Sequence, residues 1–124
     1  MSPLIIESTK TNPYICFDPS SGIYEVSGKS FSENPQEIFV VVSEWLNNNL
    51  KNITDKIDLT IQAEYFNSVS KRLLLKMLRI FEKHCISGKN IMVIWKFGDE
   101  EVENDGIIYS QLLKIPFEFI DVVY

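Results

Sequence analysis

The sequence has little of what most catalytic and metal sites require. Its 124 residues include one histidine and two cysteines. Neither a glycine-rich phosphate loop nor a Cys-x-x-Cys spacing occurs, so nucleotide-dependent catalysis and a zinc site have no support. The lone His84 falls late on a predicted amphipathic helix, where a surface or boundary position is the simpler interpretation. We therefore expect no catalytic residues, no cofactor and no metal site.

Positive charge and long apolar runs are also scarce. Twelve Lys and Arg residues face 17 Asp and Glu, a net charge of −5, which argues against a nucleic-acid binder because phosphate affinity needs a positive face. The longest aliphatic and aromatic run, 38–42, is far shorter than the roughly 20 residues that span a bilayer. No signal peptide is visible, and two cysteines are too few for a disulfide scaffold. We expect a cytoplasmic protein that binds no membrane and has reduced thiols at Cys16 and Cys85, both in apolar, core-like stretches; its oligomeric state stays open.

Apolar patterning indicates an α/β fold in a single domain, 1–124. Short apolar runs or period-two alternation predict strands at 4–6, 14–17, 23–26, 57–63, 91–97 and 117–123. The run 91–97 is apolar almost throughout, which is typical of a strand buried on both faces. Helical spacing predicts a helix of about 16 residues that starts at Pro35, a second helix over 68–85, and a third whose first turn lies in the acidic segment 99–105. Because strands and helices alternate, we expect helices packed on a mixed sheet through right-handed crossovers.

Helix starts and charged faces suggest further features. Asn34 is the expected cap of the first helix, with Pro35 at its first position and Glu37 reaching back to the cap. A basic stripe on the second helix is either a solvent face or a docking face for an acidic partner or a phosphate. It consists of Arg72, Lys76, Arg79 and Lys83, with Lys71 as a fifth basic residue if it is counted. The acids at 99–105 fit a solvated helix start better than a calcium site, because the EF-hand spacing is missing.

The segment 65–72 joins a strand to the second helix and contains two aromatics beside a polar turn. Asn67 or Ser68 is the expected N-cap. Tyr65 and Phe66 precede the cap, where we expect them to be exposed. Exposed aromatics beside a turn are typical of a contact surface.

Several stretches together resemble the SiaC-type family of bacterial regulatory phosphoproteins, in the family's order and at compatible spacing. They are Gly28-Lys29-Ser30-Phe31-Ser32-Glu33-Asn34, Trp45-Leu46, Tyr65-Phe66-Asn67-Ser68-Val69-Ser70 and Ile115-Pro116-Phe117-Glu118, with Gly88 and the strand ending at Trp95 also fitting. The resemblance spans residue 14 to the end of the chain. It implies a STAS-like domain, similar to anti-sigma-factor antagonists, that is a substrate of regulatory enzymes and not an enzyme itself.

The resemblance also implies a phosphorylation switch. The family's Asn-Thr-Ser-Ser motif falls on residues 67–70, and its phosphorylated threonine falls on Ser68, with Ser70 as the alternative acceptor. This chain departs from the motif at Ser68, at Val69 and at Arg72, which replaces the usual lysine. Implied partners are a serine/threonine kinase, a metal-dependent phosphatase and an effector such as a diguanylate cyclase, bound by the unphosphorylated form.

The expected partner-binding surface surrounds this acceptor. It comprises Tyr65, Phe66, Asn67, Val69 and Arg72, with Glu33 and Asn34 at its border. The alternative function is a small STAS-like domain that senses a nucleotide or a lipid, which the missing phosphate loop disfavours.

Overall fold

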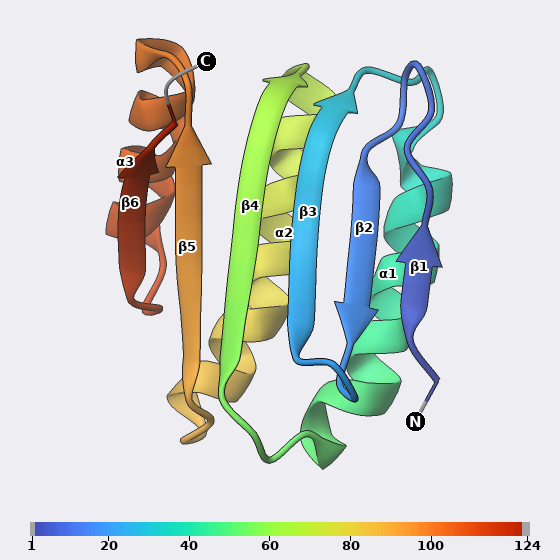
Figure 1. Cartoon of the computed structure of the whole chain (residues 1–124), viewed down its shortest axis with the longest axis vertical. Helices are drawn as coiled ribbons and strands as arrows, with labels where there is room; N and C mark the ends of the chain where they lie inside the picture. The colour runs from blue at the N-terminus through green and yellow to red at the C-terminus, as the bar shows by residue number, and fades with distance from the viewer. Residues whose placement is uncertain (1, 123–124) are drawn as a thin grey trace.

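Six strands form one sheet in chain order, and three helices lie against one of its faces (Figure 1). The computed structural model describes residues 2–122. The strands are β1 (Leu4–Ile6), β2 (Tyr14–Asp18), β3 (Ile23–Ser30), β4 (Ile57–Phe66), β5 (Ile91–Phe97) and β6 (Phe117–Asp121). The helices are α1 (Pro35–Asn49), α2 (Ser68–Ile86) and α3 (Glu100–Leu112), with a short 3-10 helix, η1 (Leu50–Asn52), after α1. The predicted end of the last strand at Val123 lies outside the described residues.

The sheet is mixed, as the sequence predicts. β1, β2 and β3 are antiparallel neighbours, whereas β3, β4, β5 and β6 run parallel. One helix connects each parallel pair, and crossovers of this kind are right-handed, so a sequential strand order places all the helices on the same face. The carboxyl ends of β3, β4 and β5 therefore lie at one edge of the sheet, the upper edge in Figure 1, where α1, α2 and α3 begin.

The core fills the space between the sheet and the helices. Alternate residues of the central strands point into it, and Ile61 pairs with Trp95 across β4 and β5. The Trp95 ring is 1% exposed, and its indole nitrogen donates to the Val102 carbonyl of α3 at 2.9 Å. Phe17 and Phe81 meet edge to face at a centroid distance of 5.9 Å, which joins β2 to α2.

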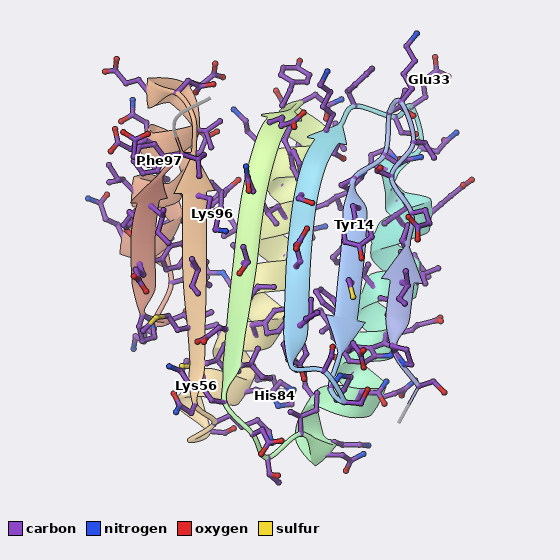
Figure 2. All side chains as sticks on the ribbon, in the orientation of Figure 1. Tyr14, Glu33, Lys56, His84, Lys96 and Phe97 are labelled. Carbon is purple, nitrogen blue, oxygen red and sulfur yellow. The ribbon has the colours of Figure 1, made fainter. Side chains whose placement is uncertain are left out.

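No helix formed by residues 2–122 covers the opposite face of the sheet. Tyr14 and Lys96 project from this face in Figure 2. On β5, Met92 and Ile94 are only half-buried, while Ile91, Val93 and Trp95 are buried on the helix side. The prediction that β5 is buried on both faces is therefore wrong, because all three crossovers cover the same side.

The N-termini of the helices show that the capping prediction for α1 is wrong, and they decide between the two candidate caps of α2. The Asn34 side chain makes no capping bond to α1, and the Glu37 backbone N–H donates instead to the Asn34 carbonyl at 3.3 Å. Asn67, and not Ser68, caps α2. Asp99 caps α3 by accepting from the Val102 N–H at 2.9 Å, so the acidic segment is a helix start as expected.

The remaining features concern thiols and membranes. Cys16 is buried as expected, whereas Cys85 is only half-buried, and both are free. Within residues 2–122, no helix has the length and apolar character needed to cross a membrane.

Candidate functional site

The start of α2 is fixed by a cap and leaves the expected acceptor outside. The Asn67 side-chain oxygen accepts from the Ser70 N–H at 2.9 Å, and the Asn67 carbonyl accepts from the Lys71 N–H at 2.9 Å. Ser68 is the first residue of the helix and is exposed. Its hydroxyl is therefore displayed at the positive end of the helix dipole.

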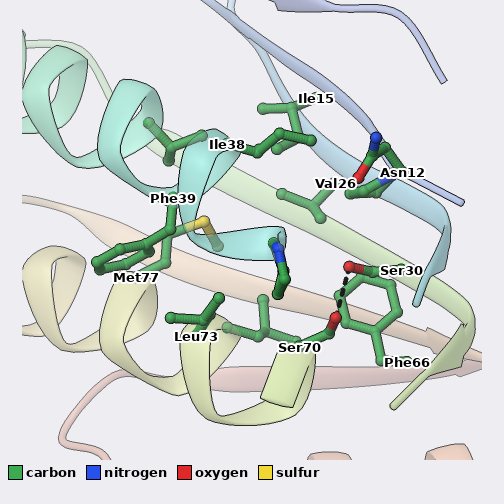
Figure 3. Close-up of a pocket in the computed structure, with 14 residues that line it drawn as sticks. Asn12, Ile15, Val26, Ser30, Ile38, Phe39, Phe66, Ser70, Leu73 and Met77 are labelled. Carbon is green, nitrogen blue, oxygen red and sulfur yellow. Dashed lines mark hydrogen bonds between the residues drawn. The ribbon is translucent and has the colours of Figure 1, made fainter. Parts of the chain in front are cut away.

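Ser70 has the opposite environment. It is 3% exposed, and its hydroxyl accepts from the Ser30 hydroxyl at 2.7 Å (Figure 3). The Asn67 N–H donates to the Ser30 carbonyl at 3.1 Å. These two bonds attach the first turn of α2 to the end of β3, and they keep the Ser70 hydroxyl inside the fold.

The two aromatics before the cap lie on opposite sides of β4. Tyr65 is 54% exposed, and its ring meets that of Phe31 at a centroid distance of 6.0 Å in an edge-to-face arrangement. Phe66 is only 8% exposed, so the expectation of two exposed aromatics is wrong for it. The reason is that β4 continues through Phe66, and successive side chains of a strand point to opposite faces. Phe31, which was not among the expected site residues, is half-buried and supports the exposed Tyr65 ring.

A small apolar cavity separates the starts of α1 and α2. Its volume is about 50 Å³, and Phe66, Ser30 and Ser70 line one side (Figure 3). Pro35 lines it from α1, so the β3–α1 loop lies next to the start of α2. Glu33 and Asn34 are exposed in this loop, and Figure 2 places Glu33 at the same edge of the sheet as the end of β4.

The remaining predicted residues lie along α2. Val69 is half-buried, and Arg72 is exposed one turn after Ser68. The other members of the basic stripe, Lys76, Arg79 and Lys83, are exposed as well, so the stripe does face solvent.

Lys71, a possible fifth member of the basic stripe, makes ion pairs that the sequence patterns did not predict. Its ammonium lies 3.0 Å from Asp105 Oδ2 and 3.4 Å from Glu101 Oε1 of α3. The hydrogen bond to Asp105 is the main cause of the raised Lys71 pKa. The Tyr109 hydroxyl donates to the Lys71 carbonyl at 3.0 Å, and burial raises the pKa of Tyr109 to about 12. No local signal marks these contacts, because their partners lie 30 or more residues apart.

The single histidine of the chain is His84. His84 lies at the edge of the sheet opposite Glu33 (Figure 2), and burial is the main cause of its lowered pKa. In the part of the chain that the structure describes, no group of His, Cys, Asp and Glu side chains is arranged to hold a metal ion.

Comparison with known proteins gives a consistent family and fold. The model of the SiaC family regulatory phosphoprotein matches residues 6–122. An uncharacterized protein of Pseudomonas aeruginosa strain UCBPP-PA14 is 27% identical over 97 residues, which cover 78% of this chain and 77% of the relative.

Solved structures share the fold over nearly the whole chain. The crystal structure of apo-SiaC from Pseudomonas aeruginosa aligns with a TM-score of 0.88 at 24% identity and covers 96% of this chain and 98% of that one. The crystal structure of the diguanylate cyclase SiaD in complex with its activator SiaC, from the same species, aligns with a TM-score of 0.88 at 23% identity, covering 96% and 99%. At this identity the likeness establishes the mixed sheet and its three helices.

Proposed function

Because the chain belongs to the SiaC family of regulatory phosphoproteins, we propose that it binds a partner protein without catalysing a reaction, and that phosphorylation of Ser68 switches this binding. The observation that carries the proposal is the position of Ser68. Its hydroxyl is exposed on the first residue of α2, beside the exposed Tyr65.

The environments of the two candidate serines favour Ser68 as the acceptor. A kinase must reach the hydroxyl oxygen, and Ser68 presents it to solvent. The Ser70 hydroxyl is buried and bonded to Ser30, so a kinase would first have to open the start of α2. Val69 carries no hydroxyl. Ser70 is therefore the weaker of the two candidates.

A phosphate on Ser68 changes the surface far more than the fold. It adds about −1.5 to −2 charges at neutral pH, and the unpaired N–H groups of a helix start stabilise such a charge by roughly 0.3–1 kcal/mol. A partner packed on Tyr65 and the α2 start would have to desolvate this dianion, which costs several kcal/mol unless a cation meets it. Phosphorylation therefore favours release of the partner.

The proposed binding surface combines exposed and supporting residues. Tyr65, Arg72, Glu33 and Asn34 are exposed and contact the partner. Asn67 and Val69 are half-buried, and the buried Phe66 supports the surface from within. The proposed partners are a serine/threonine kinase, a metal-dependent phosphatase and an effector of the diguanylate cyclase type, since a SiaC protein has been solved in complex with such a cyclase.

Cavity size favours protein binding over the alternative of a nucleotide- or lipid-sensing domain. Two cavities lie at the carboxyl edge of the sheet in the part of the chain that the structure describes, and they measure about 50 and 120 Å³. Sites for drug-sized ligands measure roughly 300–1,000 Å³. Calorimetry with nucleotides, on the protein alone, distinguishes the alternatives, and a saturable heat of binding would support the sensing domain.

The decisive experiment combines modification and binding. Incubation with ATP and the kinase encoded in the same genome, followed by peptide mapping, is expected to place one phosphate on Ser68. Ser68→Ala is expected to retain binding to the genome's diguanylate cyclase, and protein carrying phosphoserine at position 68 is expected to lose it. Phosphate found only elsewhere, or equal binding by both proteins, would overturn the proposal.

A further inference from the structure

Lys71 is the residue through which the starts of α2 and α3 are joined. Its ammonium is paired with Asp105 at 3.0 Å and with Glu101 at 3.4 Å, and its carbonyl accepts from the Tyr109 hydroxyl at 3.0 Å. Both carboxylates belong to α3, whereas Lys71 lies in the first turn of α2. A change in the pairing of this one side chain therefore acts on both helices.

The start of α3 has space beside it and few other polar ties to α2. A cavity of about 120 Å³ lies between the helix starts and is lined by Lys71, Asp105 and Tyr109 as well as by Trp95. At the far end of α3, by contrast, Arg79 donates to the Leu112 carbonyl at 3.3 Å, and Glu82 accepts from the Lys114 N–H at 2.7 Å. The far end is thus tied to α2 independently of Lys71.

The carboxylates of α3 and a phosphate on Ser68 would compete for the Lys71 ammonium. The first turn of α3 is strongly acidic, with Glu100, Glu101 and Glu103 following the capping Asp99. Ser68 precedes Lys71 by three residues, a spacing that puts two helical side chains within reach of one another. A phosphate there carries more charge than either carboxylate, and it would be repelled by this acidic turn unless a cation paired with it.

We propose that the Lys71 ammonium changes its partner when Ser68 is phosphorylated. It leaves Asp105 and Glu101 and pairs with the phosphate, and the start of α3 is held less tightly to α2 as a result. The inference rests on the proposed function in taking Ser68 as the acceptor. It adds a second consequence of phosphorylation, at a helix that carries no part of the modified motif.

Hydrogen exchange measures the loosening directly. Phosphoserine is introduced at position 68 during synthesis of the full chain, and amide exchange is followed by mass spectrometry in peptides covering residues 100–112. We expect exchange in the first two turns of α3 to become about threefold faster, the size expected for loss of partly exposed ion pairs. Lys71→Met is expected to produce a similar acceleration without phosphate, and the phosphate is expected to add little in that background.

The second pKa of the phosphate provides a readout that a merely structural role of Lys71 would not move. Phosphorus NMR titration of the phosphoserine protein is expected to give a value below the usual one of about 6, because a nearby cation favours the dianion. Lys71→Met should raise this pKa towards its usual value. Lys76→Met is the matched control, since Lys76 is exposed two turns from Ser68 and makes no ion pair with the residues that the structure describes.

Three results would overturn the proposal. The first is unchanged amide exchange of α3 in the phosphoserine protein. The second is an equal effect of the phosphate on α3 exchange with and without the Lys71 side chain. The third is a shift of the phosphate pKa that disappears in Arg72→Met but persists in Lys71→Met. Failure of the kinase to modify Ser68 would instead contradict the proposed function. The two failures are distinguishable because the phosphate is placed without the kinase.

Discussion

At the scale of single residues, the hydroxyl pair of Ser30 and Ser70 shows how a polar contact inside the core locates a surface site. The two oxygens are 2.7 Å apart, and both residues are buried. A buried hydroxyl without a partner costs free energy, so each serine requires the other. The pair therefore fixes where α2 begins relative to β3, and with it the position of Ser68.

Replacing one or both members of this pair tests that dependence. We expect Ser30→Ala and Ser70→Ala each to lower the free energy of unfolding by about 1–2 kcal/mol, because each leaves one buried hydroxyl unpaired. The double variant should cost no more than either single change, since it leaves neither group unsatisfied. Urea unfolding of the four proteins measures the cycle, and additive losses would contradict the interpretation.

Gly106 is a second residue with a specific structural requirement. It is buried in the middle of α3, and a Cβ added there would overlap the indole ring of Trp95. That ring is itself buried and bonded to the Val102 carbonyl, so it has little freedom to move.

We expect Gly106→Ala to destabilise the protein by about 1–3 kcal/mol despite the higher helix propensity of alanine, because overpacking outweighs propensity. The neighbouring Ile107→Ala, at an exposed site, is the control and should change the free energy of unfolding by about 0.5 kcal/mol or less. Chemical denaturation compares the two. A stabilised Gly106→Ala protein would show that α3 moves aside at little cost.

At the scale of elements, two asparagines that precede helices have different roles. The Asn67 side chain caps α2, whereas that of Asn34 makes no bond to α1. We expect Asn67→Ala to lower the free energy of unfolding by about 1 kcal/mol, and Asn34→Ala to have a much smaller effect. Thermal or urea unfolding of both variants is the measurement, and equal losses would mean that the cap bond contributes nothing.

The link between α2 and the segment after α3 depends on pH. Glu82 accepts from the Lys114 N–H, and this bond is the main reason for its lowered pKa. A carboxylate with a lowered folded-state pKa stabilises the protein above its unfolded value of about 4.5, and this stability is lost as the pH falls through the lower folded-state pKa. We expect Glu82→Gln to be less stable than the parent at pH 7, with the difference shrinking towards pH 3 in urea unfolding. A difference independent of pH would contradict this.

The strands and helices could be predicted from the sequence. Which face of the sheet the helices cover could not. Alternation in 57–63 and helical spacing in 68–85 reflect which side of each element is buried, and β4 and α2 are confirmed. The apolar run of β5 does not reveal that one of its faces lacks a helix, because this depends on the order of the strands in the sheet. Phe66 was expected to be exposed because β4 was predicted to end earlier than it does.

At the scale of the whole molecule, the family and the fold followed from motifs spread along the chain, and both are confirmed. The acceptor and the binding surface stay predictions. The ion pairs of Lys71 could not be predicted from the sequence, because its carboxylate partners lie on another helix. Opposite charges on α2 and α3 are visible in the sequence, but only the folded chain brings them to one edge of the sheet.

The last prediction concerns what phosphorylation does to the molecule as a whole. A phosphate on Ser68 takes the formal net charge from −5 to about −7, yet it lies at a helix start that favours negative charge. We expect the free energy of unfolding of the phosphoserine 68 protein to stay within about 1 kcal/mol of the parent, even though α3 loosens locally.

Phosphoserine at position 70 is the matched comparison. It would put a dianion where the Ser70 hydroxyl is buried against Ser30, and it should destabilise the fold by several kcal/mol. Urea unfolding of both proteins separates the cases, and a large loss at position 68 would mean that phosphorylation acts by unfolding and not by altering the surface.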